Sequence, residues 1–99
     1  MSLLKISEKI ILNKLKKIEY GSLKLINYDG QVFHFGNLEN ELTADIKINN
    51  EKFYFNIIIG GSSALGEAHM SKDFYSTNLT NLIELTARNI RLVHSFSGS

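Results

Sequence analysis

Residues 53–74 read FYFNIIIGGSSALGEAHMSKDF, and the interpretation of this stretch decides the fold expected for the whole chain. Its first part, Phe53–Ile59, is rich in β-branched and aromatic residues, which predicts a buried strand. The glycine pair that follows predicts a turn, and residues 62–70 predict a short helix with Ser62 or Ser63 as its N-cap. Because glycine-rich turns from strand to helix often hold ligands, this turn is the first candidate site.

The turn resembles half of a phosphate-binding motif. Residues 61–66 match the first six positions of a P-loop, which continues with Lys and then Ser or Thr to bind phosphate and magnesium. Glu67 and Ala68 stand at these two positions, where a carboxylate would repel phosphate and an alanine cannot bind a metal. The sequence also contains no G-x-G-x-x-G, so neither kind of nucleotide site is predicted here.

Length and composition predict one small, soluble domain. The chain has 99 residues, of which 43% are apolar, and no apolar run approaches the roughly 20 residues that span a bilayer. Lysines interrupt the apolar residues near the N-terminus, which argues against a secretory signal. The absence of cysteine excludes disulfides, thiolate catalysis and cysteine-bound zinc, and His34, His69 and His94 lack the spacing of metal ligands. These features favour a cytoplasmic protein without a metal.

Charge is spread unevenly although the net charge is only +1. Residues 1–19 carry five lysines against two acids, a balance of +3, whereas residues 20–70 carry three lysines against six acids, a balance of −3. Proteins that coat nucleic acid are usually more basic overall, so no nucleic-acid partner is expected. The basic segment coincides with the first predicted helix.

That first helix is expected over residues 3–19, ending at Tyr20-Gly21. Apolar residues recur there at helical spacing, at Leu4, Ile11, Leu15 and Ile18. Three lysines cluster on one flank of this stripe: Lys5, Lys9 and Lys16. Such a flank is a candidate membrane surface, because it attracts anionic headgroups. The alternative is an ordinary solvated face of a helix packed on a sheet.

Strands are expected over residues 21–28, 31–35 and 42–48, in addition to Phe53–Ile59. Asp29-Gly30 predicts a two-residue hairpin turn with positive φ at both positions. A parallel crossover takes about a dozen residues or more, which the short links exclude, so an antiparallel meander of four strands is expected.

A last helix is expected over residues 78–93, with an inner stripe formed by Leu79, Leu82, Ile83, Thr86, Ile90 and Val93. The order α-β-β-β-β-α-α predicts an α+β fold with its helices packed on one face of the sheet. Residues 1–94 are expected to form a single domain, and residues 95–99 a tail or the start of a linker.

A set of motifs in this order resembles the N-terminal domain of cyclopropane-fatty-acyl-phospholipid synthases, over most of residues 20–91. The motifs are Gly21-x-Leu23-x-Leu25, Asp29-Gly30, Phe35-Gly36, Ala44-x-Ile46-x-Ile48, Phe53 and Gly66-Glu67-Ala68-x-Met70. In that family the last motif usually has a tyrosine before its methionine and is followed by aspartate, glycine and tryptophan. Here His69 replaces the tyrosine, Ser71-Lys72 replaces the aspartate–glycine pair, and Phe74 lies near the tryptophan position.

The resemblance implies an accessory domain with no catalytic, cofactor-binding or metal-binding residue of its own. In the family, the chemistry resides in a C-terminal methyltransferase domain that binds S-adenosylmethionine, and no glycine-rich motif of that domain occurs in this sequence. The family's N-terminal domain is similar in fold to sterol-carrier-like lipid-binding modules. The implied partners are a phospholipid or membrane surface, the methyltransferase domain, and a second copy in a homodimer. The implied location is the cytoplasm or the inner membrane face.

Residues 66–70 are the candidate lipid or domain interface: Gly66, Glu67, Ala68, His69 and Met70. On a helix, Glu67 and His69 would point about 200° apart, so the alternative is that Glu67 supports the turn and His69 lies at the surface. We therefore expect a non-catalytic domain that assists phospholipid engagement. Two alternatives stay open, an oligomerisation or docking module without lipid binding and a free-standing lipid carrier whose phenylalanine-rich strands line an acyl cavity.

Overall fold

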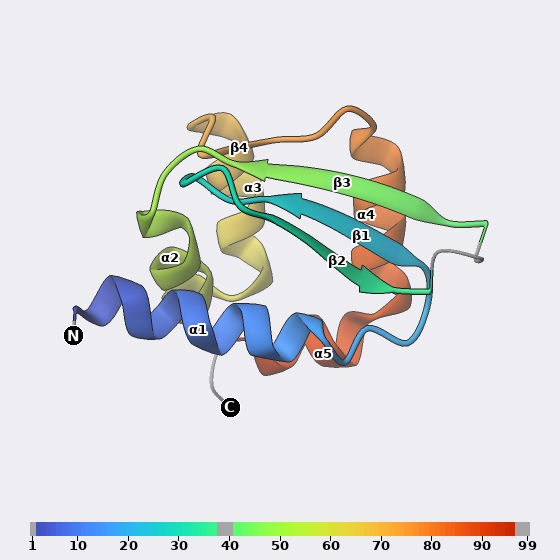
Figure 1. Cartoon of the computed structure of the whole chain (residues 1–99), viewed down its shortest axis with the longest axis horizontal. Helices are drawn as coiled ribbons and strands as arrows, with labels where there is room; N and C mark the ends of the chain where they lie inside the picture. The colour runs from blue at the N-terminus through green and yellow to red at the C-terminus, as the bar shows by residue number, and fades with distance from the viewer. Residues whose placement is uncertain (1, 38–40, 97–99) are drawn as a thin grey trace.

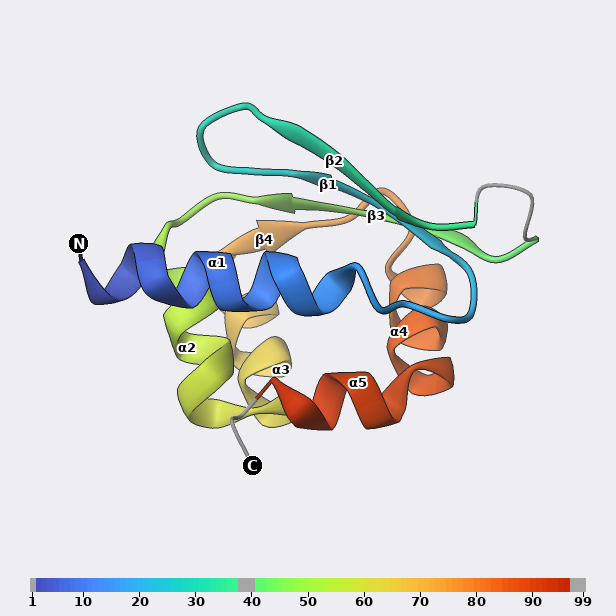
Figure 2. The ribbon, with the colours of Figure 1, turned by 60° about the horizontal axis from the view of Figure 1, so that its bottom comes forward.

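A computed structural model describes residues 2–37 and 41–96 of the chain. In these ranges the helices are α1 (Leu3–Leu15), α2 (Lys52–Gly60), α3 (Ser62–Met70), α4 (Leu79–Arg88) and α5 (Ile90–Ser95). The strands are β1 (Ser22–Ile26), β2 (Val32–Gly36), β3 (Thr43–Ile48) and β4 (Phe74–Tyr75). The helices lie on one side of a four-stranded sheet, so the expected α+β class is confirmed (Figure 1 and Figure 2).

The sheet is mixed, with strand order β2-β1-β3-β4. β1 pairs antiparallel with β2, and β3 with β4, but β1 and β3 are parallel, with Leu23 opposite Ala44. The expected antiparallel meander is therefore wrong. Two parallel strands need a long connection, and here that connection contains β2. The chain leaves β1, runs back beside it as β2, and then enters β3 on the other side of β1.

The hairpin at Asp29-Gly30 is confirmed, although its turn differs from the expected one. Gly30 has a positive φ of 89°, whereas Asp29 does not. The Asn27 N–H donates to the Gln31 carbonyl at 2.8 Å, which leaves three residues in the loop. This is the arrangement of a type I turn followed by a left-handed glycine, rather than a two-residue turn.

The segment predicted as a strand at Phe53–Ile59 is a helix, α2, and this is the main correction to the expected fold. The residues buried in it are Phe53, Tyr54 and Ile57, while Ile59 is exposed. A strand would bury alternate residues, whereas burial at the first, second and fifth positions follows a helix. The aromatic and β-branched composition of this segment therefore correctly predicted that it is buried, but it did not predict the backbone conformation.

Local signals at both ends of α2 are those of a helix. The Asn50 side-chain oxygen accepts the Lys52 N–H at 2.9 Å, and the Asn50 carbonyl accepts the Phe53 N–H at 3.0 Å. At the other end Gly61 has a φ of 65°, which stops the helix. Asn49-Asn50 therefore leads into a helix and not into another strand.

The helix predicted at residues 62–70 is confirmed as α3, but its N-cap residue is Gly61 instead of the expected serine. The fourth strand follows this helix instead of preceding it. It is β4, in which Phe74 pairs with Ile48 of β3.

The last predicted helix, residues 78–93, is divided in two. Asn78 starts α4, and its side-chain oxygen accepts the Asn81 N–H at 3.0 Å. Asn89 then separates α4 from α5. The second helix extends through Ser95, and Phe96 is buried, so these two residues of the expected tail belong to the packed body. Residues 97–99 lie outside the described ranges.

The first helix is also shorter than expected, since α1 ends at Leu15 and a turn follows, in which the Ile18 N–H donates to the Leu15 carbonyl at 3.2 Å. Its Ile11 and Leu15 enter the core between the helices and the sheet. Figure 2 shows this layer of helices on one side and the uncovered face of the sheet on the other.

Candidate functional site

The predicted interface at residues 66–70 lies on α3, and the helix sends its side chains in different directions. Gly66 and His69 line a cleft between α3 and the α4–α5 pair. Glu67 and Ala68 line a separate pocket beside α2. Met70 is 85% exposed and lines neither. The five residues therefore do not form one site, because a helical turn spreads neighbours over its circumference.

The cleft beside α3 has a volume of about 400 Å³ and is mainly apolar. It is lined by side chains from three helices and from β4: Leu65, His69, Phe74, Leu79, Ile83, Thr86, Ile90 and Val93. Ile83 and Ile90 are exposed at its mouth. A cleft of this size lies within the range of small-molecule sites, about 300–1,000 Å³.

The polar groups of this cleft do not make a catalytic arrangement. The His69 ring packs edge-on against Phe74, with 5.7 Å between ring centroids. The Thr86 hydroxyl donates to the Ile83 carbonyl at 2.7 Å, as exposed helical threonines often do. A nucleophile would need to be engaged by a base, but the Thr86 hydroxyl is bonded within its own helix and the His69 ring packs on Phe74. The cleft can accept an apolar group and offers one imidazole at its wall.

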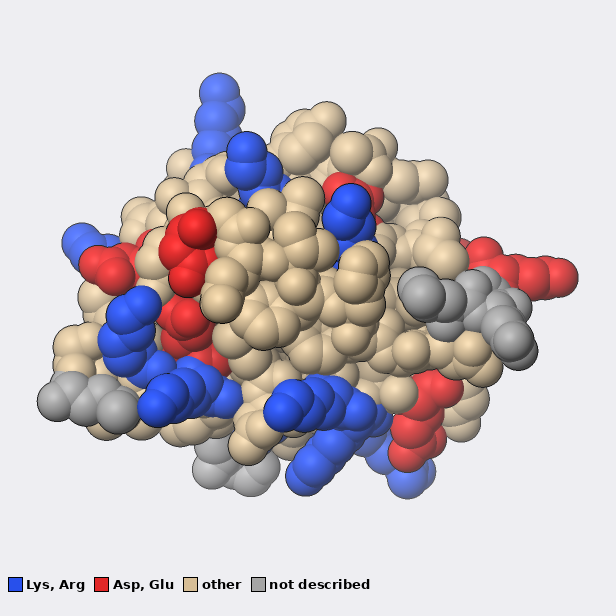
Figure 3. Space-filling view, viewed as in Figure 1, with Lys and Arg blue, Asp and Glu red and all other residues tan. Residues whose placement is uncertain are grey.

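The three lysines predicted as a membrane surface lie on exposed positions of α1 and just after it, and they have different surroundings. Lys5 donates to the Tyr28 hydroxyl at 2.7 Å and lies 3.8 Å from Glu8. Lys9 and Lys16 have no hydrogen bond or ion pair within the described part of the chain. Figure 3 shows Lys and Arg side chains gathered along the lower edge of the molecule, where α1 lies in Figure 1.

The same helix exposes three large aliphatic side chains that lie outside its predicted apolar stripe. Leu3, Ile6 and Ile10 are 60%, 40% and 39% exposed. Their spacing of three and four residues places them in one row along α1. The outer face of α1 thus combines an apolar row with Lys9 and Lys16 beside it.

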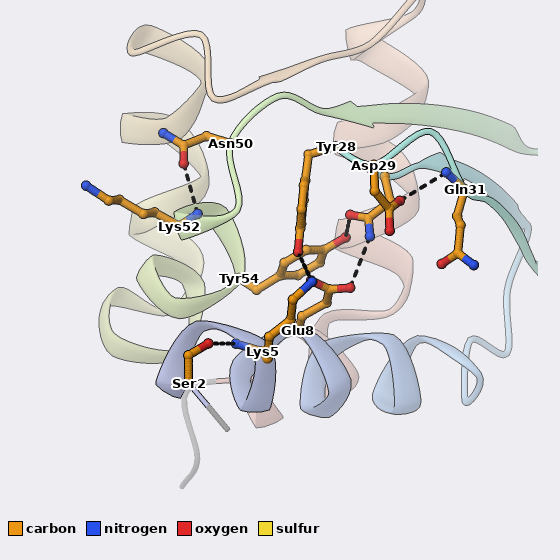
Figure 4. A network of polar contacts seen from close by, with 10 residues as sticks. Ser2, Lys5, Glu8, Tyr28, Asp29, Gln31, Asn50, Lys52 and Tyr54 are labelled. Atoms are coloured by element: carbon orange, nitrogen blue, oxygen red, sulfur yellow. Dashed lines mark hydrogen bonds and ion pairs between the residues drawn. The ribbon is translucent and has the colours of Figure 1, made fainter.

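A buried polar cluster joins α1 to the β1–β2 hairpin and to α2, as Figure 4 shows. At its centre Asn27 is 1% exposed. The Asn27 side-chain oxygen accepts the Tyr54 hydroxyl at 2.6 Å, and its amide donates to Glu8 at 3.1 Å. The Tyr28 hydroxyl donates to the other Glu8 oxygen. We call Glu8, Asn27, Tyr28 and Tyr54 the polar cluster.

Both tyrosines of the polar cluster have raised pKa values, so their hydroxyls stay protonated and donate hydrogen bonds. Burial, followed by the charge of Glu8, raises the pKa of Tyr54 far above its usual range. The hydrogen bond to Glu8 raises the pKa of Tyr28, against a smaller lowering by Lys5. The hydrogen bond to Tyr28 in turn raises the pKa of Lys5. Because no side-chain nitrogen or oxygen buried in the described residues lacks a partner, the cluster is a satisfied structural network.

No motif in the sequence indicates this cluster, because its members come from distant parts of the chain. Glu8 is 19 residues before Asn27, and Tyr54 is 27 residues after it, so no short spacing connects them. Tyr54 also lies in the segment whose composition predicts a strand. A second missed residue is Asn89, whose side chain accepts from the Glu19 and Tyr20 N–H groups and donates to the Tyr20 and Leu85 carbonyls. Asn89 thereby ties the α4–α5 break to the loop before β1.

The histidines lie on separate elements, His34 on β2, His69 on α3 and His94 on α5. Among the described residues, no group of three or more His, Asp or Glu side chains is placed to hold a metal ion. Within those same ranges, none of the helices is both long and apolar enough to cross a bilayer. Comparison of the chain with protein-family models, with curated proteins and with solved structures found no match.

Proposed function

We propose that this chain is a non-catalytic module that engages a phospholipid surface through the outer face of α1. The observation that carries the proposal is the row of exposed Leu3, Ile6 and Ile10 beside the unpaired Lys9 and Lys16. A helix that lies in the membrane interface buries an apolar face among the acyl chains and places lysines near the headgroups. α1 has an exposed apolar row and exposed lysines beside that row.

The charges should set the lipid preference. A lysine near an anionic membrane surface contributes about 1 kcal/mol, so the two unpaired lysines together contribute about 2 kcal/mol. That energy corresponds to a preference of about 30-fold for anionic over neutral vesicles at low salt. The three aliphatic side chains should contribute equally to both kinds of vesicle, because their burial does not depend on headgroup charge.

We further propose that the module serves a larger enzyme that resembles cyclopropane-fatty-acyl-phospholipid synthases, with S-adenosylmethionine bound by a separate methyltransferase domain. The support is the motif order from Gly21 to Met70 and the position of Gly66, the first residue of the last motif, in the lining of an apolar cleft. The sterol-carrier-like relation of the fold belongs to the same proposal. The chain alone should form no cyclopropane product from S-adenosylmethionine and unsaturated phospholipid vesicles, and measurable product would contradict this role.

Vesicle co-sedimentation tests the proposed surface. We expect the wild-type chain to pellet with vesicles that contain about 30% phosphatidylglycerol and to pellet less with pure phosphatidylcholine. The double variant Lys9→Glu/Lys16→Glu should lose the difference between the two. Lys24→Glu/Lys47→Glu, which makes the same charge change on the open sheet face, is the matched control and should bind as the wild type does.

The apolar row has its own arm of the test. Ile6→Ser/Ile10→Ser should weaken binding to both kinds of vesicle, whereas Ile59→Ser, at an exposed position of α2, should not. Equal losses in the two double-lysine variants would show that binding follows net charge alone. That result would rule out the α1 face as a specific surface.

A second candidate function rests on the cleft between α3 and the α4–α5 pair. Its volume and apolar lining suit part of an acyl chain, as a small lipid carrier would require. A fluorescent fatty acid should then bind the chain in the absence of membranes, and Leu65→Trp should block the cleft and abolish that binding. Binding to vesicles without fatty-acid binding would favour the α1 surface alone.

A further inference from the structure

The outer edge of β2 has no neighbour among the described elements. β2 is the first strand in the sheet order β2-β1-β3-β4, and Figure 2 shows it at the rim of the sheet, away from the helices. The hydrogen bonds from Asn27 N–H to the Gln31 carbonyl and from Asn37 N–H to the Gly21 carbonyl fix the phase of the β1–β2 ladder. Because antiparallel bonds alternate, Phe33 and Phe35 bond to β1. The N–H and C=O groups of Val32 and His34 therefore point outward.

Within residues 2–37 and 41–96, this edge lacks the charged side chains, the proline and the covering strand that usually protect an edge strand. Natural edge strands are blunted by lysines, prolines, bulges or a covering element. The β2 sequence Val32-Phe33-His34-Phe35-Gly36 has no proline and no carboxylate, lysine or arginine. Figure 3 shows an uncharged strip across the middle of the face where β2 lies in Figure 1. The closest charged side chain across the ladder is Lys24 of β1, which pairs with His34.

The side chains of the edge are partly uncovered as well. Val32 is 50% exposed on the open face of the sheet. On the helix-covered face, the half-buried Phe33 stacks on the buried Phe35, with 6.1 Å between ring centroids. An added strand would therefore cover apolar surface on both faces of β2.

We propose that β2 pairs antiparallel with β2 of a second copy of this chain, about a two-fold axis at Phe33. Val32 of each copy is then opposite His34 of the other, and the outward N–H and C=O groups of both residues form four hydrogen bonds. The two Phe33 residues are directly opposite, in the closer, non-hydrogen-bonded kind of pair, with a Cα separation of about 4.5 Å.

A second copy fits this edge for two reasons. An antiparallel strand is complementary to itself under a two-fold axis, since every outward donor meets an outward acceptor. The strand also contains no Lys, Arg, Asp or Glu that would place like charges against its copy. The axis is perpendicular to the sheet, so the two sheets continue into one and the helices of both copies lie on the same side.

The expected affinity decides how the proposal must be tested. One pair of short strands buries less than a standard interface, which is about 1,200–2,000 Å² in total. We therefore expect a weak dimer, with a dissociation constant of micromolar order, that dilution separates. Sedimentation velocity between 5 and about 500 μM should show a reversible monomer–dimer equilibrium for the wild type. A wild-type chain that stays monomeric over this whole range would overturn the proposal.

Substitutions at His34 locate the interface. His34→Pro removes the outward N–H and no bond to β1, because proline is accepted in an edge strand where its nitrogen faces outward. It should weaken the dimer at least tenfold while circular dichroism stays native. His34→Thr keeps the N–H and should dimerise within about threefold of the wild type. Unchanged dimerisation of a folded His34→Pro variant would overturn the proposal, because the interface would then lie elsewhere.

Amide hydrogen exchange of the wild type gives a test that needs no variant. The Phe33 and Phe35 amides should be protected at every concentration, since they bond to β1. The Val32 and His34 amides should gain protection, by roughly the fraction of dimer, only as concentration rises. A dimer that leaves the Val32 and His34 amides unchanged would contradict the proposed pairing, even if the His34→Pro variant failed to fold.

Discussion

Two parts of the α1 surface each carry a lysine, but the two lysines have different surroundings. At one part, Lys5 and Glu8 face the hairpin tip and contact Tyr28 and Asn27. At the other, Lys9 has no partner among the described residues and lies near the exposed Ile6 and Ile10. Lys5 and Lys9 lie one turn apart on the same flank of the helix. What the fold places opposite a lysine, and not its position along the helix, decides whether it stabilises the molecule or stays free for a partner.

The largest effect on the bonded side of α1 is expected from a substitution at Asn27, the centre of the polar cluster. Asn27→Leu leaves the Tyr54 hydroxyl and one Glu8 oxygen without a partner, so we expect a loss of about 3 kcal/mol in the free energy of unfolding. Urea denaturation measures it. Asn56→Leu, at an exposed position of α2, is the control and should change stability little. A loss below about 1 kcal/mol would show that the cluster hardly contributes to holding α1.

Removing one hydroxyl from the same cluster should have a smaller effect. Tyr54→Phe leaves only the Asn27 oxygen unpaired, and we expect a loss of about 1–2 kcal/mol by urea denaturation at pH 7. Tyr75→Phe, on an exposed residue of β4, is the control and should be close to neutral.

The same residue predicts a change of stability with pH. Because the fold raises the pKa of Tyr54, this tyrosine keeps its proton in the folded state while it ionises in the unfolded chain, above about pH 10. The contribution of Tyr54 is therefore complete below about pH 10 and is lost as pH rises beyond it. Stability measured from pH 8 to 11 should fall more steeply for the wild type than for Tyr54→Phe. Parallel profiles would argue that Tyr54 ionises as readily in the fold as outside it.

The smallest expected effect separates Lys5 from Lys9 directly. The hydrogen bond from Lys5 lowers the pKa of Tyr28, so Lys5→Met should raise that pKa further above its usual range. Lys9→Met should leave it unchanged. Titration of the Tyr28 ring signals by NMR measures both variants. Equal responses would mean that Lys5 points to solvent as Lys9 does.

The parts of the fold that depend on neighbours in sequence were predictable. The hairpin at Asp29-Gly30, the strand at residues 42–48 and the helix at residues 62–70 are all present. Each is specified by an alternation, a turn pair or a glycine within its own few residues. The lysines of the α1 flank were also identified, because a helical period places them together.

The errors arose where the deciding contact is distant in sequence. Phe53–Ile59 has strand composition, yet it forms α2 because Tyr54 reaches the buried Asn27 while Phe53 and Ile57 enter the core. The break at Asn89 depends on the N–H groups of Glu19 and Tyr20 and on the Tyr20 carbonyl, which no local pattern reveals. The cleft likewise needs three helices and β4 to meet, so only Gly66 and His69 of its lining were anticipated.

By itself, the sequence determined an α+β chain with a basic first helix, a tight hairpin and no cysteine chemistry, because composition and short periodicities act within a few residues. Only the tertiary structure decided the parallel pairing of β1 with β3, the helical state of Phe53–Ile59 and the difference between Lys5 and Lys9. The physical reason is that burial and hydrogen-bond satisfaction are properties of the whole packed chain. A segment with two acceptable local conformations adopts the one that leaves no buried polar group without a partner.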